Sequence, residues 1–189
     1  MDVFLGSSNT LRDQRLAFSE LANSLADPAF DACGQDVIAR LWETESYAME
    51  RNRSKQAAYD EVIRACDLVF ILVGDTLGDY TLHEYLVATE ACARKGYPRV
   101  AAWVSPAASD ENTRTLLSHA TTTPDVEVRT LTNINTMLLE MVQLMASKLG
   151  PLPLRIDDEG VWTGHKRLVS LEGVPAQAQD AFANWLAHR

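Results

Sequence analysis

The chain has 189 residues, 47% of them hydrophobic, and carries 26 acidic against 17 basic residues, a formal net charge of −9. Because an acidic chain repels phosphate backbones, we do not expect nucleic acid as a partner. No apolar run reaches the roughly 18 residues that a membrane span needs, and the first ten residues lack the basic start of a signal peptide. We therefore expect a cytoplasmic protein with no membrane partner.

Apolar runs alternate with amphipathic stretches along residues 1–150. The run DLVFILVG at residues 67–74 is the most apolar and predicts a central strand that is buried on both faces. The expected strands are residues 1–6, 37–42, 67–74, 99–104 and 126–130. The expected helices are residues 11–25, 56–65, 81–95, 109–119 and 133–149, with Pro28 and Cys33-Gly34 in loops. This alternation predicts an α/β domain whose parallel sheet, in the order 2-1-3-4-5, is flanked by helices.

The pattern changes after Gly150-Pro151. Short apolar stretches separated by turn residues predict antiparallel strands at residues 154–156, 161–162 and 168–171. A final amphipathic helix is expected at residues 175–188. The sequence thus divides into an α/β domain, residues 1–150, and an appended β-hairpin and helix, residues 151–189.

Ligands of open α/β sheets bind beyond the carboxyl ends of the strands, and the loop after the first strand holds Ser7 and Ser8 there. Backbone N–H groups at a helix N-terminus favour anions, and Arg12 and Arg15 follow closely in the sequence. The structural alternative is that Ser8 or Asn9 only caps the helix. Trp42, at the end of the second strand, either stacks on a planar ring or fills the core.

Glu84 is the sharpest candidate for chemistry. It is placed in the first turn of the helix after the most buried strand, and no apolar period accounts for it. The alternative is structural, because Thr81 and Glu84 have the spacing of a capping box. Tyr80, four residues before Glu84, is placed to stack on a planar ring, and His83 is expected to be solvated. The sequence contains no evident Ser/His/Asp constellation or cluster of metal ligands.

Three segments resemble bacterial Toll/interleukin-1 receptor (TIR)-like domains and, more broadly, the group of TIR domains and nucleoside deoxyribosyltransferases. They are VFLGSSNT at the first strand, LWETESYAMERNRSKQAAYDEVIRACDLVFILVGDTLGDYTLHEYLVATEA at residues 41–91, and the closing stretch 160–186. The core of the resemblance covers about residues 1–130. It implies a flavodoxin-like five-stranded parallel sheet and the cleavage of NAD to nicotinamide and ADP-ribose products or cyclic variants.

The resemblance also implies roles for single residues. Glu84, in HEYLVATEA, corresponds to the catalytic glutamate, and Tyr80 corresponds to an aromatic residue that is Trp in some relatives. Residues 43–53 correspond to a mobile loop that gates the site and builds assemblies, with Tyr47 as the aromatic residue of that loop. Ser7 and Ser8 match the first-strand loop near the nucleotide. Relatives often join such a domain to a sensing module, which here would be a separate sensor domain or chain.

One carboxylate is enough for this chemistry, because it stabilises or attacks the oxocarbenium-like ribosyl cation. Nicotinamide leaves a pyridinium as a neutral ring and needs no general acid, whereas a neutral nucleoside usually needs one. We therefore expect an oligomerisation-activated NAD glycohydrolase (an NAD+ nucleosidase) of bacterial anti-phage immunity, with NAD as substrate and no cofactor or metal. Glu84 is the expected catalytic residue, and the expected substrate-binding residues are Ser7, Ser8, Arg12, Trp42, Tyr47 and Tyr80.

Two alternatives to the NAD glycohydrolase stay open. The first is a nucleoside deoxyribosyltransferase or nucleotide N-glycosidase on the same scaffold, which product analysis with deoxynucleosides would separate from an NAD-cleaving enzyme. The second is a non-catalytic TIR-like adaptor that only assembles. In an adaptor Glu84 would be no more than a helix cap, and no nucleotide would be consumed.

Overall fold

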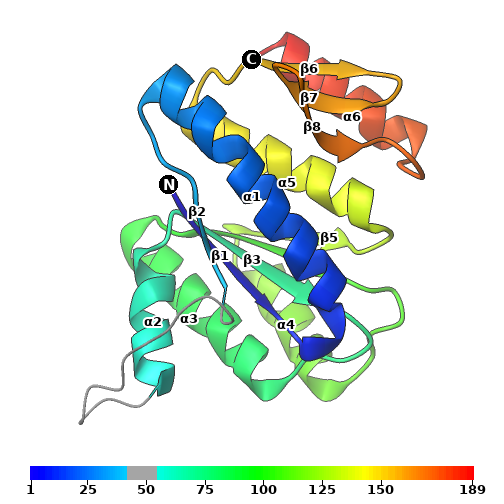
Figure 1. The fold of residues 1–189 in the computed structure, drawn as a ribbon. Helices are drawn as coiled ribbons and strands as arrows, with labels where there is room; N and C mark the ends of the chain where they lie inside the picture. The colour runs from blue at the N-terminus through cyan, green and yellow to red at the C-terminus, as the bar shows by residue number, and fades with distance from the viewer. Residues whose placement is uncertain (42–54) are drawn as a thin grey trace. The chain divides into compact units, whose positions relative to one another are not determined.

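The computed structural model describes residues 1–41 and 55–189, without the side chains of Asn9 and Lys55. Five strands form one sheet in the order β2-β1-β3-β4-β5, and the pairs β1–β3, β3–β4 and β4–β5 are parallel (Figure 1). The strands are β1 (Asp2–Ser7), β2 (Ile38–Arg40), β3 (Leu68–Val73), β4 (Arg99–Val104) and β5 (Val126–Thr130). The predicted strand order is confirmed.

Strand β3 is the centre of the sheet, as its composition predicts. All six of its residues are buried, and it pairs with β1 on one side and β4 on the other. A parallel strand covered on both faces has no solvent side, so its sequence shows no polar alternation. The uninterrupted apolar run therefore identified the middle of the sheet correctly.

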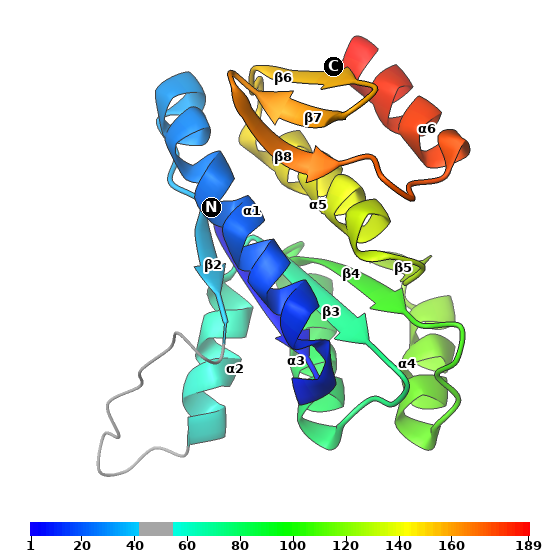
Figure 2. The same cartoon turned by 45° about the vertical axis from the view of Figure 1, so that its right-hand side comes forward.

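Helices α2 (Lys55–Ala65), α3 (Asp79–Lys95) and α4 (Glu111–Thr122) lie on one face of this sheet (Figures 1 and 2). They cover a core cluster to which β3 and β4 contribute every second residue, as the two-residue period of a strand requires, and β1 contributes Phe4. The strand residues of the cluster are Phe4, Val69, Ile71, Val73, Val100, Ala102 and Val104. The same cluster buries Cys66 and Cys92, which are small core side chains.

The described chain forms two compact units. One unit contains residues 2–15 and 39–131, that is, most of the sheet, the short 3-10 helix η1 (Asn9–Leu11) and the helices α2 to α4. The other contains Met1 and residues 16–38 and 132–189. Its elements are most of α1 (Arg12–Cys33), α5 (Ile134–Leu149), β6 (Leu154–Asp157), β7 (Gly160–Thr163), β8 (Lys166–Ser170) and α6 (Ala176–Ala187).

Strands β6, β7 and β8 pair antiparallel in that order, and α6 follows them, which confirms the hairpin and helix expected at the end of the sequence. The predicted domain boundary at residues 150 and 151 stays a prediction.

The expected bounds of the first helix and the second strand are wrong. Helix α1 does not end near Leu25 but continues through Pro28 to Cys33. Proline inside a helix removes one helical hydrogen bond at a cost of about 3 kcal/mol, and the helix nevertheless continues, with Ala29 directly after the proline fully buried. The second strand, expected over residues 37–42, is three residues long, and short strands are usual at the edge of a sheet.

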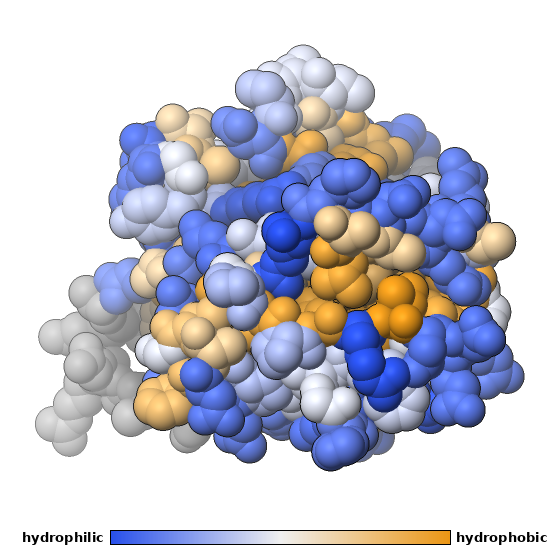
Figure 3. Space-filling model, turned by 90° about the horizontal axis from the view of Figure 1, so that it is seen from above, coloured by the Kyte–Doolittle hydropathy of each residue, from blue (hydrophilic) through white to orange (hydrophobic). Residues whose placement is uncertain are grey.

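Hydrophilic side chains cover much of the surface in Figure 3, with a band of hydrophobic ones between them. Large apolar side chains are exposed at Leu16, Phe30, Ile38, Tyr80, Leu86, Tyr97, Leu117 and Val128. Within the described part of the chain, no helix has both the length and the apolar character that crossing a bilayer would require.

Candidate functional site

Helix α3 begins two residues earlier than the sequence predicts. Its N-cap is Gly78, which makes no side-chain cap hydrogen bond, and its first residue is Asp79. Thr81 is therefore inside the helix and buried, and Glu84 is in the second turn instead of the first. Because a capping box requires its first residue at the N-cap, the capping role considered for Glu84 is wrong.

The Glu84 carboxylate instead lies against the main chain of β1. A Cβ built on Gly6 would stand only 2.6 Å from Glu84 Oε2. Gly6 pairs with Ile71 in the register of β1 and β3, so the carboxylate lies near the carboxyl ends of two adjacent strands. Ligands of open α/β sheets bind at this edge.

The surroundings of Glu84 disfavour its charged form. Desolvation by burial, and secondly the negative charge of Asp60 on α2, raise the pKa of Glu84 from its ordinary 4.5 to about 8. Among the described residues, none forms a hydrogen bond or ion pair with this carboxylate. A desolvated carboxylate without a partner is stabilised either by taking up a proton or by a cation that enters the site.

Asp60 is held in place by side chains of two helices. Nε2 of His83 on α3 lies 3.0 Å and 3.2 Å from its two carboxylate oxygens, and Gln56 Nε2 donates to it at 3.1 Å. Arg64 lies 3.8 Å away. His83, which we expected to be solvated, is 46% exposed and bound to Asp60. Sequence reasoning missed Asp60 because its effect on Glu84 crosses from one helix to another.

The loop after β1 is braced by Arg15, not by Arg12. Arg15 is buried, and its Nη1 donates to Ser7 Oγ at 3.1 Å and to the carbonyl oxygen of Ser8 at 2.5 Å. Ser8 occupies the N-cap position of η1, but its hydroxyl pairs with that of Thr10 at 2.7 Å and makes no cap hydrogen bond. Arg12 is exposed at the start of α1. The fold thus brings Ser7, but not the Arg12 side chain, into the buried edge of the sheet.

The aromatic candidates are placed differently. Tyr80 lies in the first turn of α3 and is 76% exposed, so its ring is open to solvent rather than packed in the core. Trp42, Tyr47 and the segment 43–53, predicted to gate the site, lie outside the described residues.

The loop between β3 and α3 is tied to α4 by two side chains that the sequence did not single out. Asp110, the N-cap of α4, accepts a hydrogen bond from the Leu77 N–H at 3.1 Å. Asn112 donates to the Leu77 carbonyl oxygen at 3.0 Å and to Asp79 Oδ1 at 2.7 Å. These bonds hold the start of α3, and with it the helix that carries Glu84.

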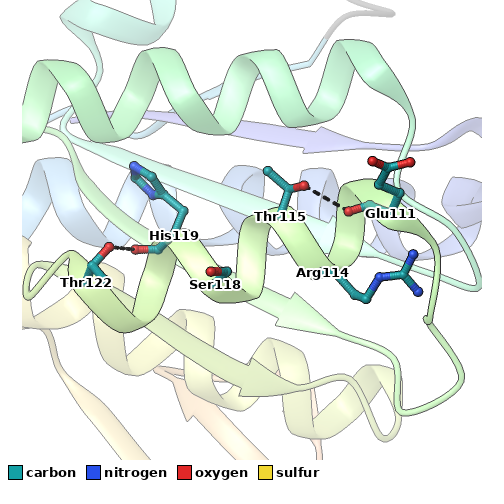
Figure 4. A pocket seen from close by; sticks show the side chains of 6 residues that line it. All are labelled: Glu111, Arg114, Thr115, Ser118, His119 and Thr122. Atoms are coloured by element: carbon teal, nitrogen blue, oxygen red, sulfur yellow. Dashed lines mark hydrogen bonds between the residues drawn. The ribbon is translucent and has the colours of Figure 1, made fainter.

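Two surface hollows in this unit do not include Glu84. One, shown in Figure 4, runs along α4 and is lined by Glu111, Arg114, Thr115, Ser118, His119 and Thr122. The other is bordered by residues of α2, α3 and α4, among them His83, Leu86 and His119. His119 turns from α4 toward α3, where its Nδ1 lies 3.0 Å from the Tyr85 hydroxyl. Over the described residues, no three potential metal ligands are grouped.

Comparison of the chain with models of protein families, with curated proteins and with solved structures finds no match. A fold of this kind hosts many different activities, so function has to be inferred from the residues of the site.

Proposed function

We propose that the protein is a TIR-like NAD glycohydrolase in which Glu84 is the catalytic carboxylate. The supporting observation is the position of this side chain: it is desolvated at the ligand-binding edge of the sheet, and no described residue pairs with it. A carboxylate in this state interacts most strongly with a cation, because charge interactions gain strength as water is excluded.

In NAD cleavage, a positive charge lies next to the scissile bond both in the bound substrate and as the bond breaks. The nicotinamide ring is a pyridinium in the substrate, and as the bond from its nitrogen to the ribose C1′ breaks, the electron pair stays on the ring. Nicotinamide leaves neutral and the positive charge passes to the ribosyl group, where a carboxylate stabilises it. Water then adds to C1′ and releases a proton, giving ADP-ribose; attack by an adenine nitrogen gives a cyclic product instead.

The raised pKa of Glu84 is compatible with this role. In the free protein the carboxyl group holds a proton over much of the neutral range. A bound pyridinium is an opposite charge, which lowers the pKa of a neighbouring carboxyl, so substrate binding expels the proton and leaves the ionised form that the reaction needs. The kcat/KM for NAD should therefore increase as the pH rises toward about 8, because this ratio reports the ionisation of the free protein.

The same pKa favours a second candidate, an N-glycosidase or deoxyribosyltransferase acting on neutral nucleosides. Here the protonated Glu84 would be a general acid for the leaving base. The two candidates predict opposite pH dependence: cleavage of a neutral nucleoside slows as the pH rises through about 8, because the acid form is lost.

Product analysis tests both candidates. Concentrated protein is incubated with NAD and, separately, with deoxynucleosides, and nicotinamide, ADP-ribose, cyclic products and free bases are separated by chromatography. The proposal expects nicotinamide from NAD, and Glu84→Gln as the inactive control. Base release from deoxynucleosides alone would select the second candidate, and no consumption of nucleotide at any protein concentration would leave a non-catalytic adaptor. A role in anti-phage immunity, self-association through residues 43–53 and a separate sensor domain or chain belong to the same proposal.

A further inference from the structure

Gly6 lies on the face of β1 that α3 covers. Side chains alternate along a strand, and Phe4, two residues earlier, points into the core cluster under α2, α3 and α4. Gly6 is buried in the same strand and has no positive φ, so its backbone conformation does not require glycine. Glycine inside a strand costs stability and often marks a place where another group approaches closely.

The group that approaches Gly6 is the Glu84 carboxylate. A Cβ at position 6 would lie 2.6 Å from Glu84 Oε2, 3.1 Å from Ile71 Cδ1 and 3.3 Å from Phe4 Cε1. Real Cβ atoms essentially never come within 3.0 Å of another heavy atom, so the Glu84 carboxylate is the one group of the three that has to leave its position. The other two contacts are tight but call for small adjustments.

We propose that Gly6 is a positioning residue for Glu84. Because glycine has no side chain, a space remains near the end of β1, and the Glu84 carboxylate lies in this slot. The steric pairing of the two residues is independent of the reaction, whereas its effect on turnover rests on the proposed function. An alanine at position 6 would force Oε2 outward by at least 0.4 Å, the difference between 2.6 Å and 3.0 Å. Because the side chain is flexible, the carboxylate moves and the strand stays in place.

Kinetics of Gly6→Ala test the positioning role. A misplacement of about 1 Å costs about a hundredfold in rate, so for a displacement of at least 0.4 Å we expect kcat for nicotinamide release from NAD to fall about fivefold or more, with KM little changed. The carboxylate also becomes more hydrated, so the rise of the rate with pH should move to lower pH. The matched control is Gly74→Ala, another added Cβ at the end of a strand, whose three nearest neighbours are side-chain carbons of Leu11, the nearest at 3.3 Å. It should retain the parent's kcat and pH profile.

Unfolding midpoints test the steric pairing without any activity. Gly6→Ala should lower the midpoint in the parent and equally in Glu84→Gln, because glutamine fills the same slot. In Glu84→Ala, which empties the slot, the same substitution should lower the midpoint by less than half as much. If Gly6→Ala folds only in the Glu84→Ala background, the pairing is supported. Equal losses in all three backgrounds, or failure to fold in all of them, would overturn it.

The two measurements separate the two proposals. A parent that leaves NAD intact refutes the proposed function, while the unfolding midpoints still decide the pairing of Gly6 and Glu84. A parent that releases nicotinamide, together with a Gly6→Ala variant that keeps the parent's kcat and pH profile, supports the function and refutes the positioning role.

Discussion

Substitution of Glu84 by glutamine changes the charge of residue 84 with almost no change in size, and its effect on stability should depend on pH. The pKa of this carboxyl group is about 8 in the folded protein against an ordinary 4.5. Below pH 4.5 the group is protonated in both the folded and the unfolded chain, so the parent and the variant should be equally stable. Between pH 4.5 and 8 the unfolded chain releases the proton and the folded one keeps it, so the parent loses stability as the pH rises.

The size of this loss follows from the pKa difference of 3.5 units. At 1.36 kcal/mol per unit the limit is about 5 kcal/mol. Glu84 is half-buried rather than fully enclosed, and partial hydration reduces the penalty, so we expect Glu84→Gln to be more stable than the parent by about 2 kcal/mol at pH 9. Urea unfolding at pH 4.5 and pH 9 measures the difference.

The same variant should lose nicotinamide release from NAD by at least about a hundredfold, because the ribosyl cation no longer meets a negative charge. The control is Glu90→Gln, which removes an exposed carboxylate of the same helix that pairs with Arg94. It should change neither the activity nor the pH dependence of stability. A Glu84→Gln variant with the parent's rate would refute the catalytic assignment. Equal stability of both proteins at pH 9 would show that folding does not desolvate the Glu84 carboxylate.

Three further predictions concern the surroundings of Glu84. Asp60→Asn removes a charge that raises the pKa of Glu84, so the rise of NAD cleavage with pH should shift to lower pH; an unchanged profile would contradict this. Asp110→Ala removes the cap of α4 and the bond to Leu77, and should lower the free energy of unfolding by about 1–2 kcal/mol in urea; a loss below about 0.3 kcal/mol would show that neither bond matters. Specific activity should increase with protein concentration, and deletion within residues 43–53 should abolish that increase; full turnover by a dilute monomer would contradict activation by assembly.

The sheet could be predicted because its signals are local. The apolar run that forms β3 and the alternation of strands and helices are both visible in the hydrophobic pattern of short stretches of sequence. The errors also have local causes. Pro28 suggested a helix end, but the helix continues through it to Cys33. The Thr81 hydroxyl suggested an N-cap, but the helix begins two residues earlier, at Asp79.

Glu84 could be singled out as a candidate because a polar residue near the start of a helix after a central strand lies at the ligand-binding edge of an α/β sheet. The contacts around Glu84 could not be predicted from the sequence. The choice of Arg15 over Arg12 depends on the η1 turn, and the bonds of Asp110 and Asn112 to Leu77 join residues more than thirty positions apart. Sequence spacing contains no signal for contacts of this kind.

The sequence by itself determined the class of fold, the central strand and the residue on which the chemistry is proposed to depend, because hydrophobic period and the alternation of strands and helices along the chain are properties of neighbouring residues. Only the tertiary structure decided what surrounds that residue. Glu84 has a raised pKa because the fold removes it from water beside Asp60, and it fits there because position 6 of a distant strand carries no side chain. Desolvation and steric fit arise between segments that meet only when the chain is folded.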